Sequence, residues 1–434
     1  MLILVVRRPA IAIRLVVTAD NHLGRYYDRM FSHRLEERRS WLRRGFSRAV
    51  EYALENRAHF FLQAGDLFDS PEPRNLERQF VAEALARLRS AGVRCLGIGG
   101  NHDTPRARRG SAAATPQATY ARLGGLRLLG EYWAAGSDDT PANGGHAGGL
   151  GMPSGTVTPA RSCSLDSPLD SEIFDVEGVR VAVGGMAPDP TLPAGSDPLD
   201  GVSWRPEADV ALLILHGSLE GHVYPGAPEP ILRRQTVESL EGIDCLLVGH
   251  VHRYAAFRWG ERTVVVPGAT EQMTFAEQDG RPGFAYMELE PGRVVDLRQV
   301  PVECQPRRQL EIATAELAEA PDPAEALKAR LEDLCERDAM VRVALKGPIS
   351  RQRYHDLKLR EVAEHGAARS FFFDLDTTGL YVDDEQGSGV AGGVRLSQRE
   401  ELIRFARERW EAATTQAERR LLEEALRLVL DGYQ

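Results

Sequence analysis

Residues 99–103, Gly-Gly-Asn-His-Asp, decide how the rest of this sequence is interpreted. They follow an apolar run, residues 93–98, which predicts a buried strand, and the glycines let the backbone turn where that strand ends. Asn101 offers a carbonyl oxygen suited to a cation beside a phosphate. His102 can move a proton near neutral pH, and Asp103 can hold that imidazole in one tautomer. A polar turn without a chemical role is the alternative, and the pentapeptide alone does not separate the two.

The composition is that of a globular protein with two or three domains. The chain has 434 residues, of which 43% are hydrophobic and 27% charged. No apolar run approaches the length of a membrane span, and the charges at the start follow the apolar residues, unlike a secretory signal. The five cysteines are far apart and form no CxxC pair, so we expect a cytoplasmic protein without disulfides. The net charge of -10 excludes a chain that is basic overall, although a local basic patch remains possible.

Polar residues follow each of the first predicted strands. Residues 11–18 are apolar and β-branched and lead to Asp20 and His22; residues 59–64 lead to Asp66. With the strand at 93–98 these segments form three strand–helix units, which favours an α/β fold with parallel strands. Open α/β sheets place their sites at the carboxyl ends of such strands.

A second set of predicted strands also ends in histidines. Residues 211–215 lead to His216, and residues 243–248 lead to His250 and His252. Five of the eleven histidines thus fall at predicted strand ends, which is difficult to attribute to chance. Carboxylates, an amide and imidazoles suit two divalent ions of the Mn/Fe/Zn kind with one shared carboxylate. We assign surface or packing roles to the other histidines, namely His33, His59, His146, His222, His355 and His365.

The remaining segments predict a modular chain. A helix over about residues 34–56 carries six arginines, for which a solvated face is the favoured interpretation and contact with a phosphate backbone the alternative. Residues 134–161 are rich in Gly, Ala and Pro and are expected to form a flexible insertion. Residues 305–385 suggest a small α/β domain, and residues 397–431 hold two helix starts of the capping-box type.

These motifs resemble, in order and spacing, those of the calcineurin-like metallophosphoesterases. The motifs that carry the resemblance are Asp20-Asn21-His22, Gly65-Asp66, Gly100-Asn101-His102-Asp103, His216 and Gly249-His250-Val251-His252. The resemblance implies a four-layer α/β/β/α sandwich over residues 11–300, two divalent ions, for which we expect Mn²⁺, and His102 as proton donor to the leaving oxygen. It implies that one ion is bound by Asp20, His22, Asp66 and His252, and the other by Asp66, Asn101, His216 and His250.

Further residues resemble the SbcD-type DNA repair exonuclease branch of that family. They are His22-Leu23-Gly24, Gly65-Asp66-Leu67-Phe68-Asp69 and Pro267-Gly268-Ala269-Thr270-Glu271, with Phe275 and Glu277. The resemblance implies a capping domain at residues 305–385, C-terminal helices at 397–431 that bind an SMC-like ATPase, DNA as substrate, and a homodimer. The chain departs from the branch in its Gly-rich insertion, and Asp69 stands where some members have histidine.

The leading hypothesis is therefore a two-metal nuclease that hydrolyses phosphodiester bonds at DNA ends in double-strand break repair. One alternative is a phosphodiesterase or phosphatase for nucleotides or phosphoproteins. Another is a non-catalytic scaffold for the ATPase, against which the complete ligand set and His102 argue. For residues 397–431, packing on the catalytic domain is the alternative to docking on a partner.

Overall fold

The structure is a computed structural model that describes residues 11–27, 30–105, 114–130, 169–223, 229–277 and 279–382, with residues 409 and 419. The predicted insertion at 134–161 lies outside the described residues, as do residues 1–10 and, apart from 409 and 419, the segment 397–431. The chain divides into two compact units, Met1–Gly347 with His355–Tyr381, and Pro348–Tyr354 with Val382–Gln434. The sheets that carry the site belong to the first unit.

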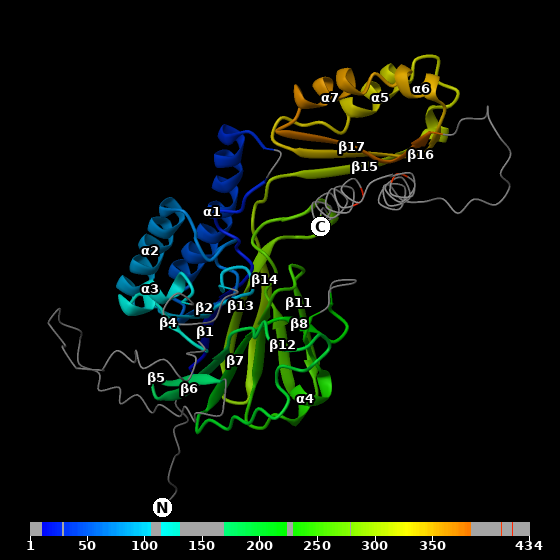
Figure 1. Cartoon of the computed structure of the whole chain (residues 1–434). Coiled ribbons are helices and arrows are strands. Elements are labelled where there is room, and N and C mark those ends of the chain that lie inside the picture. Colours follow the sequence, from blue (N-terminus) through cyan, green and yellow to red (C-terminus); the bar gives the residue numbers. More distant parts are fainter. Residues whose placement is uncertain are drawn as a thin grey trace, which may run out of the picture. The chain divides into compact units, whose positions relative to one another are not determined.

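The first sheet has six strands in the order β14-β13-β1-β2-β3-β4 (Figure 1). Its parallel strands are β1 (Ile13–Thr18), β2 (Phe60–Ala64), β3 (Arg94–Ile98) and the short β4 (Arg127–Leu128). Two antiparallel strands, β13 (Gly283–Glu290) and β14 (Arg293–Pro301), complete the sheet beside β1. Because β1, β2 and β3 run in the same direction, their carboxyl ends meet at one edge.

The second sheet has the order β11-β12-β10-β7-β6-β5 (Figure 1). Its four parallel strands are β6 (Val179–Met186), β7 (Val210–His216), β10 (Cys245–Gly249) and β12 (Arg262–Val266). The edges are antiparallel, with β5 (Asp170–Val176) forming a hairpin with β6 and β11 (Ala255–Trp259) pairing with β12.

Side chains alternate between the two faces of each sheet and so define the layers. On β1, Leu15 and Val17 face the second sheet and pack with Leu212 and Ile214 of β7, whereas Val16 faces the helices. Two long helices, α1 (Ser32–Glu55) and α2 (Asn75–Ser90), cover the outer face of the first sheet. The short α3 (Gln117–Arg122) contributes Tyr120 to the same core cluster. This arrangement confirms the expected α/β/β/α order. The fourth layer, on the outer face of the second sheet, is thin. Among the described helices only the short α4 (Arg234–Ser239) contributes to the core cluster on this face, and loop residues such as Trp204 fill the rest.

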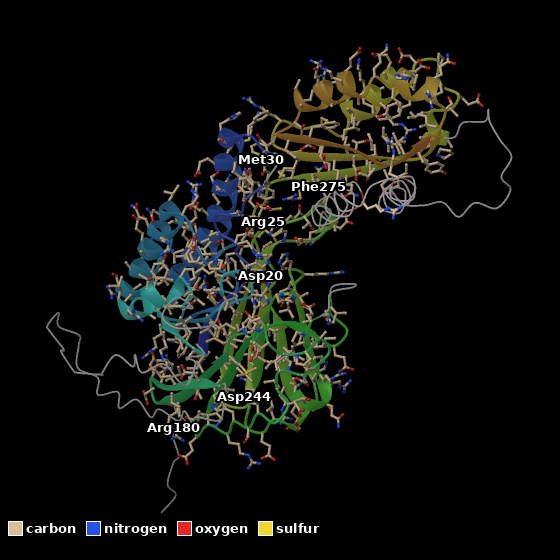
Figure 2. All side chains as sticks on the ribbon, in the orientation of Figure 1. Asp20, Arg25, Met30, Arg180, Asp244 and Phe275 are labelled. Atoms are coloured by element: carbon tan, nitrogen blue, oxygen red, sulfur yellow. The ribbon has the colours of Figure 1, made fainter. Side chains whose placement is uncertain are left out.

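A third sheet follows, in the order β15-β16-β17. Its strands are β15 (Arg307–Ala313), β16 (Met340–Ile349) and β17 (Phe372–Val382), and its helices are α5 (Pro323–Glu332), α6 (Arg351–Asp356) and α7 (Leu359–Ala367). At the start of α5 the Asp322 carboxylate caps the helix, because it accepts hydrogen bonds from the amides of Ala324 and Glu325. A small apolar cluster contains Met30 and Met340, with Phe275 packed against it. Figure 2 labels Met30 and Phe275 among the side chains.

The arginines of α1 do not form a uniformly solvated face, and the favoured interpretation is wrong for two of them. Arg38 is fully buried and forms an ion pair with the equally buried Glu271, Nη1 to Oε2 at 2.9 Å, and Arg39 is also buried. Exposed or half-exposed members of the set, such as Arg44 and Arg48, pair with glutamates. None of the described helices combines the length and apolar character needed to cross a bilayer.

Candidate metal centre

The loops that follow the parallel strands lie side by side at the carboxyl edge of the two sheets. The amide of Asp20, after β1, donates to the carbonyl of Gly65, after β2, at 3.1 Å. Across the sheets, the amide of His250, after β10, donates to both carboxylate oxygens of Asp20 at 3.0 Å. The predicted site residues of both sheets are thereby brought to one place.

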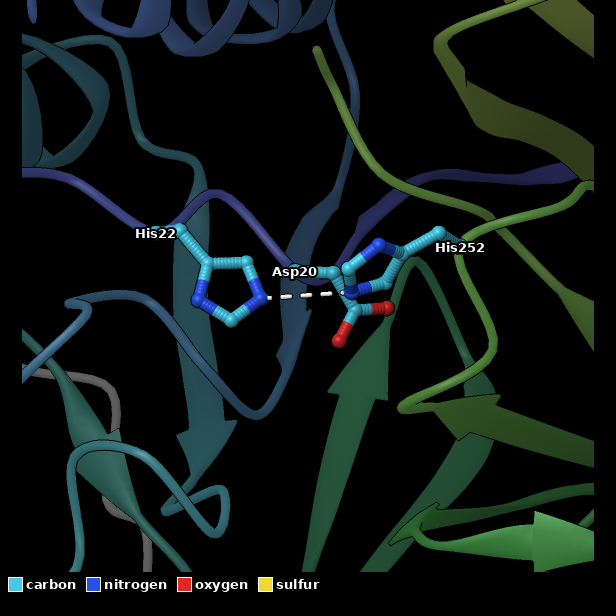
Figure 3. Close-up of side chains that lie close together, drawn as sticks. All are labelled: Asp20, His22 and His252. Carbon is cyan, nitrogen blue, oxygen red and sulfur yellow. Dashed lines mark hydrogen bonds between the residues drawn. The ribbon is translucent and has the colours of Figure 1, made fainter. Parts of the chain in front are cut away.

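One group of side chains contains Asp20, His22 and His252 (Figure 3). Each offers one ligand atom, and these atoms lie within 4.8 Å of one another. The Nε2 atoms of His22 and His252 face each other at 3.3 Å. Asp20 and His22 are buried, so the group lies inside the protein rather than on its surface.

A second group surrounds Asn101. Its Oδ1 atom lies 2.9 Å from His216 Nε2 and 3.1 Å from His250 Nδ1. The Oδ2 atom of Asp66 lies 3.4 Å from His216 Nε2 and 3.7 Å from His22 Nε2. Asp66 therefore lies between the two groups and contacts a histidine of each.

Each histidine of the two groups uses its other ring nitrogen in a hydrogen bond that points out of the centre. The four pairs are His22 Nδ1 with Asp69 Oδ1 at 3.1 Å, His216 Nδ1 with the Ala64 carbonyl at 2.8 Å, His250 Nε2 with Glu229 Oε2 at 2.8 Å, and His252 Nδ1 with Glu277 Oε1 at 3.2 Å. Carboxylates and carbonyls only accept, so the outward nitrogen carries the proton and the inward nitrogen of a neutral ring presents a lone pair. When the rings are neutral, these converging lone pairs fit a cation.

The charges of the buried side chains also favour a bound cation. Asp20 and Asp66 are both buried, and among the described residues no lysine or arginine forms an ion pair with either. Burial raises the pKa of Asp66, but the charge and hydrogen bond of His216 outweigh this effect and hold the pKa below its ordinary value. Burial lowers the pKa of His216, but Asp66 outweighs this and raises it to about 9. Without a metal, a proton on His216 thus balances the charge that a divalent ion can balance.

The backbone is strained where these side chains are attached. A positive φ occurs at Asp20 (49°), His22 (44°), Asp66 (54°) and His250 (94°), four of the seven described non-glycine residues with this conformation. Such strain concentrates at functional sites, where the surrounding structure compensates for it. The backbone at position 100 lies so close to the Asp66 carboxylate that only glycine fits there. A Cβ on Gly100 would lie 2.0 Å from Asp66 Oδ1.

His102 lies at the open side of the centre. Its ring is 42% exposed and makes an edge contact with the ring of His22, with centroids 4.7 Å apart. Its backbone amide donates to Asp66 Oδ1 at 2.9 Å. Burial of part of the ring lowers its pKa below the ordinary value. His102 thus presents an accessible ring, while its backbone amide binds the central carboxylate of Asp66.

Asp103 does not lie where the sequence suggested. Its carboxylate accepts hydrogen bonds from the amides of Gly100 and Phe68 and from the side chain of Gln117. These contacts hold the turn after β3, and burial raises the pKa of Asp103 to about 6. The carboxylate beside His102 is that of Asp69, whose Oδ1 lies 3.8 Å from His102 Nδ1 and also accepts from Arg25. His22, Asp69 and His102 form a third group of potential ligands.

Three carboxylates of the site were not proposed as site residues from the sequence. Asp69 and Glu277 belong to motifs that carry the family resemblance, so a signal for them was present. Glu229 had no such signal, because it precedes no predicted strand and belongs to no motif. Its place beside His250 depends on the pairing of the two short strands β8 (Ser218–Leu219) and β9 (Ile231–Leu232), which form a separate two-stranded sheet.

Comparisons with known proteins identify the family. The model of the calcineurin-like phosphoesterases matches residues 13–254, which is more than half of the chain. The chain is 25% identical over 295 residues to the DNA double-strand break repair protein Mre11 of Methanosarcina mazei, covering 67% of this chain and 38% of the relative. It is 27% identical over 303 residues to the Mre11 of Methanopyrus kandleri, covering 67% of this chain and 57% of that one. The chain thus spans about two fifths to three fifths of these relatives.

Among solved structures, similarity is found to a putative 5′-nucleotidase from Staphylococcus aureus in complex with α-ketoglutarate. The TM-score is 0.37 at 16% identity, over 67% of this chain and 54% of the other. A TM-score this low adds nothing to the description of the fold, which stands on its own sheets and layers. From the family match and the observed architecture, the chain belongs to the calcineurin-like phosphoesterases, a family that uses divalent metals.

Proposed function

We propose that this protein is a two-metal DNA nuclease that acts at DNA ends in double-strand break repair, together with an SMC-like ATPase. The observation that carries the proposal is the position of Asp66 between two groups of inward-facing ligand atoms, with the accessible His102 beside them. The Mre11 relatives are named as double-strand break repair proteins, which supports DNA as substrate.

One ion would be held by Asp20, His22, Asp66 and His252, and the other by Asp66, Asn101, His216 and His250. Ions in these positions would polarise the phosphoryl group and activate the attacking water. Mn²⁺ fits this mixture of carboxylate, amide and imidazole ligands.

The residues of the chain supply the proton transfer and the orientation. His102 would protonate the leaving oxygen, and its exposed ring can take up that proton from solvent beforehand. Asp69 supports this step, because its carboxylate near His102 Nδ1 stabilises the protonated ring. Asp103 would act indirectly, by fixing the turn that carries Asn101 and His102.

The remaining parts of the proposal concern organisation. Residues 305–385 would form a capping domain, residues 397–431 would bind the ATPase, and two chains would pair through helices of the catalytic domain. Light scattering at micromolar concentration tests the dimer. A cytoplasmic location agrees with the free thiols of the described cysteines Cys95, Cys245, Cys304 and Cys335.

The proposal is tested with end-labelled duplex DNA, incubated with Mn²⁺ in the presence and absence of an SMC-like ATPase. Shortening of the labelled strand that requires both the metal and Asp66 supports it. Hydrolysis of mononucleotide phosphoesters without any cleavage of DNA would instead favour a small-molecule phosphodiesterase. A protein that binds metal but cleaves neither would be the non-catalytic scaffold.

A further inference from the structure

Glu229 makes the shortest of the carboxylate contacts to the histidines of the centre, with Oε2 2.8 Å from Nε2 of His250. A carboxylate accepts hydrogen bonds and donates none, so this Nε2 carries the ring proton. The lone pair of His250 is then on Nδ1, which faces Asn101 Oδ1 at 3.1 Å. Glu229 thus decides which nitrogen of His250 is available to a metal.

His250 differs from the other histidines of the centre in the nitrogen that it presents. His22, His216 and His252 each present Nε2, the atom at the far end of the ring. His250 presents Nδ1, the atom nearer its own backbone, and its φ of 94° is the largest among the described non-glycine residues with positive φ. An Nδ1 ligand needs an acceptor on the opposite side of the ring to fix its orientation, and Glu229 is that acceptor.

The path of the chain explains why Glu229 is available. Soon after His216 comes β8 (Ser218–Leu219), which pairs in parallel with β9 (Ile231–Leu232) in a separate two-stranded sheet. Glu229 comes two residues before β9. The Ser218 hydroxyl donates to its Oε1, and the Gly195 amide donates to its backbone carbonyl at 2.8 Å. Two independent contacts thus fix Glu229 beside His250.

We propose that Glu229 is the positioning residue for one of the two metal positions, the one that contains Asn101, His216 and His250. This inference rests on the proposed metal centre and is independent of the substrate. The chain offers a matched comparison in Glu277, at the end of the 3₁₀ helix η2 (Phe275–Glu277). Glu277 Oε1 lies 3.2 Å from Nδ1 of His252, a residue of the other position.

The experiment measures Mn²⁺ binding to the full chain by titration calorimetry, with metal content checked by mass spectrometry after dialysis. In Glu229→Ala we expect the affinity for one of two ions to fall about 10–100-fold, as is typical when the hydrogen-bond partner of a metal-binding histidine is lost. Glu229→Gln is expected to lose less, because its amide oxygen still accepts from His250. Glu277→Ala is expected to weaken the other ion.

A double-mutant cycle assigns the effect to the His250 position. In a His250→Ala background, Glu229→Ala should cause no further loss, whereas Glu277→Ala should still weaken the remaining ion. The inference is overturned if Glu229→Ala binds both ions with wild-type affinity, or if its effect is equally large without His250. A wild-type chain that binds fewer than two ions would overturn the metal centre itself, so the two failures are distinguishable. Unchanged melting temperatures of the metal-free variants exclude unfolding as the cause.

Discussion

The backbone amide of His250 donates to both carboxylate oxygens of Asp20, at 3.0 Å each. Asp20 follows β1 of the first sheet, and His250 follows β10 of the second. The two residues belong to different proposed metal positions, so one hydrogen-bonded contact joins both sheets and both positions. The left-handed backbone at each residue shows that this geometry is imposed by the surrounding fold.

Replacing His102 should separate metal binding from turnover. His102→Ser removes the accessible imidazole but retains the backbone amide that donates to Asp66. We expect both ions to remain bound and cleavage of DNA to fall by about 10²–10⁴-fold, the usual contribution of general acid catalysis. Metal content and single-turnover cleavage are measured on the same preparation. Near-normal turnover would remove His102 from the mechanism.

Metal affinity should rise with pH. The pKa of His216 is about 9 in the metal-free protein, so at pH 7 this ring carries a proton that a metal must displace. The sign follows directly, because lowering the pH favours the protonated ring and opposes the metal. From about pH 7 to pH 9 we expect the apparent affinity to increase about tenfold per pH unit, with about one proton released per chain. Calorimetry in two buffers of different ionisation enthalpy counts the protons, and an affinity independent of pH would contradict the assignment.

The buried ion pair between Arg38 and Glu271 should contribute strongly to stability. Glu271 also accepts from the amides of Gln272 and Gln305, so Glu271→Ala leaves a buried guanidinium and two amides without this partner. We expect the free energy of unfolding to fall by about 3–5 kcal/mol. The control is Glu303→Ala, which removes the exposed pair with Arg44 and should cost at most about 1 kcal/mol. Equal urea midpoints for the two variants would show that the buried pair is not important.

Deletion of the chain from Ser397 onward should separate partner binding from the metal centre. Apart from residues 409 and 419 the segment lies outside the described residues, so this prediction rests on its sequence. Leu422, Ala425, Leu426 and Val429 form an apolar stripe there at helical spacing. We expect binding of an SMC-like ATPase to be lost, while metal content and Mn²⁺-dependent cleavage of single-stranded DNA are retained. Pull-down and metal analysis test this. Loss of metal on truncation would mean that the segment is part of the catalytic body.

Much of the centre could be predicted from the sequence because it depends on a local rule. Parallel strands present their carboxyl ends at one edge, so polar residues that directly follow apolar strands were expected to meet, as Asp20, Asp66 and His216 do. Glu229 could not be predicted in this way, because it follows no predicted strand and meets His250 only through tertiary structure.

The arginines of α1 show a signal that was present but not used. Buried positions of this helix include Leu35, Leu42 and Phe46, and Arg38 and Arg39 fall on the same stripe at helical spacing. The charge of Arg38 and Arg39 led to the prediction that they face solvent. Their positions on the helix, in line with the apolar residues, predict burial instead. Burial is possible because Glu271 arrives from the loop after β12, a tertiary contact that no local pattern reveals.

The central claim is that Asp66 is shared by two metal ions. Crystals grown with Mn²⁺ should show two peaks of anomalous scattering about 3.5–4 Å apart, the separation typical of two-metal sites, with Asp66 between them. The same crystals of Asp66→Asn should lose both peaks or retain them only weakly. A single peak in the wild-type protein, or two peaks at full height in Asp66→Asn, would contradict the account.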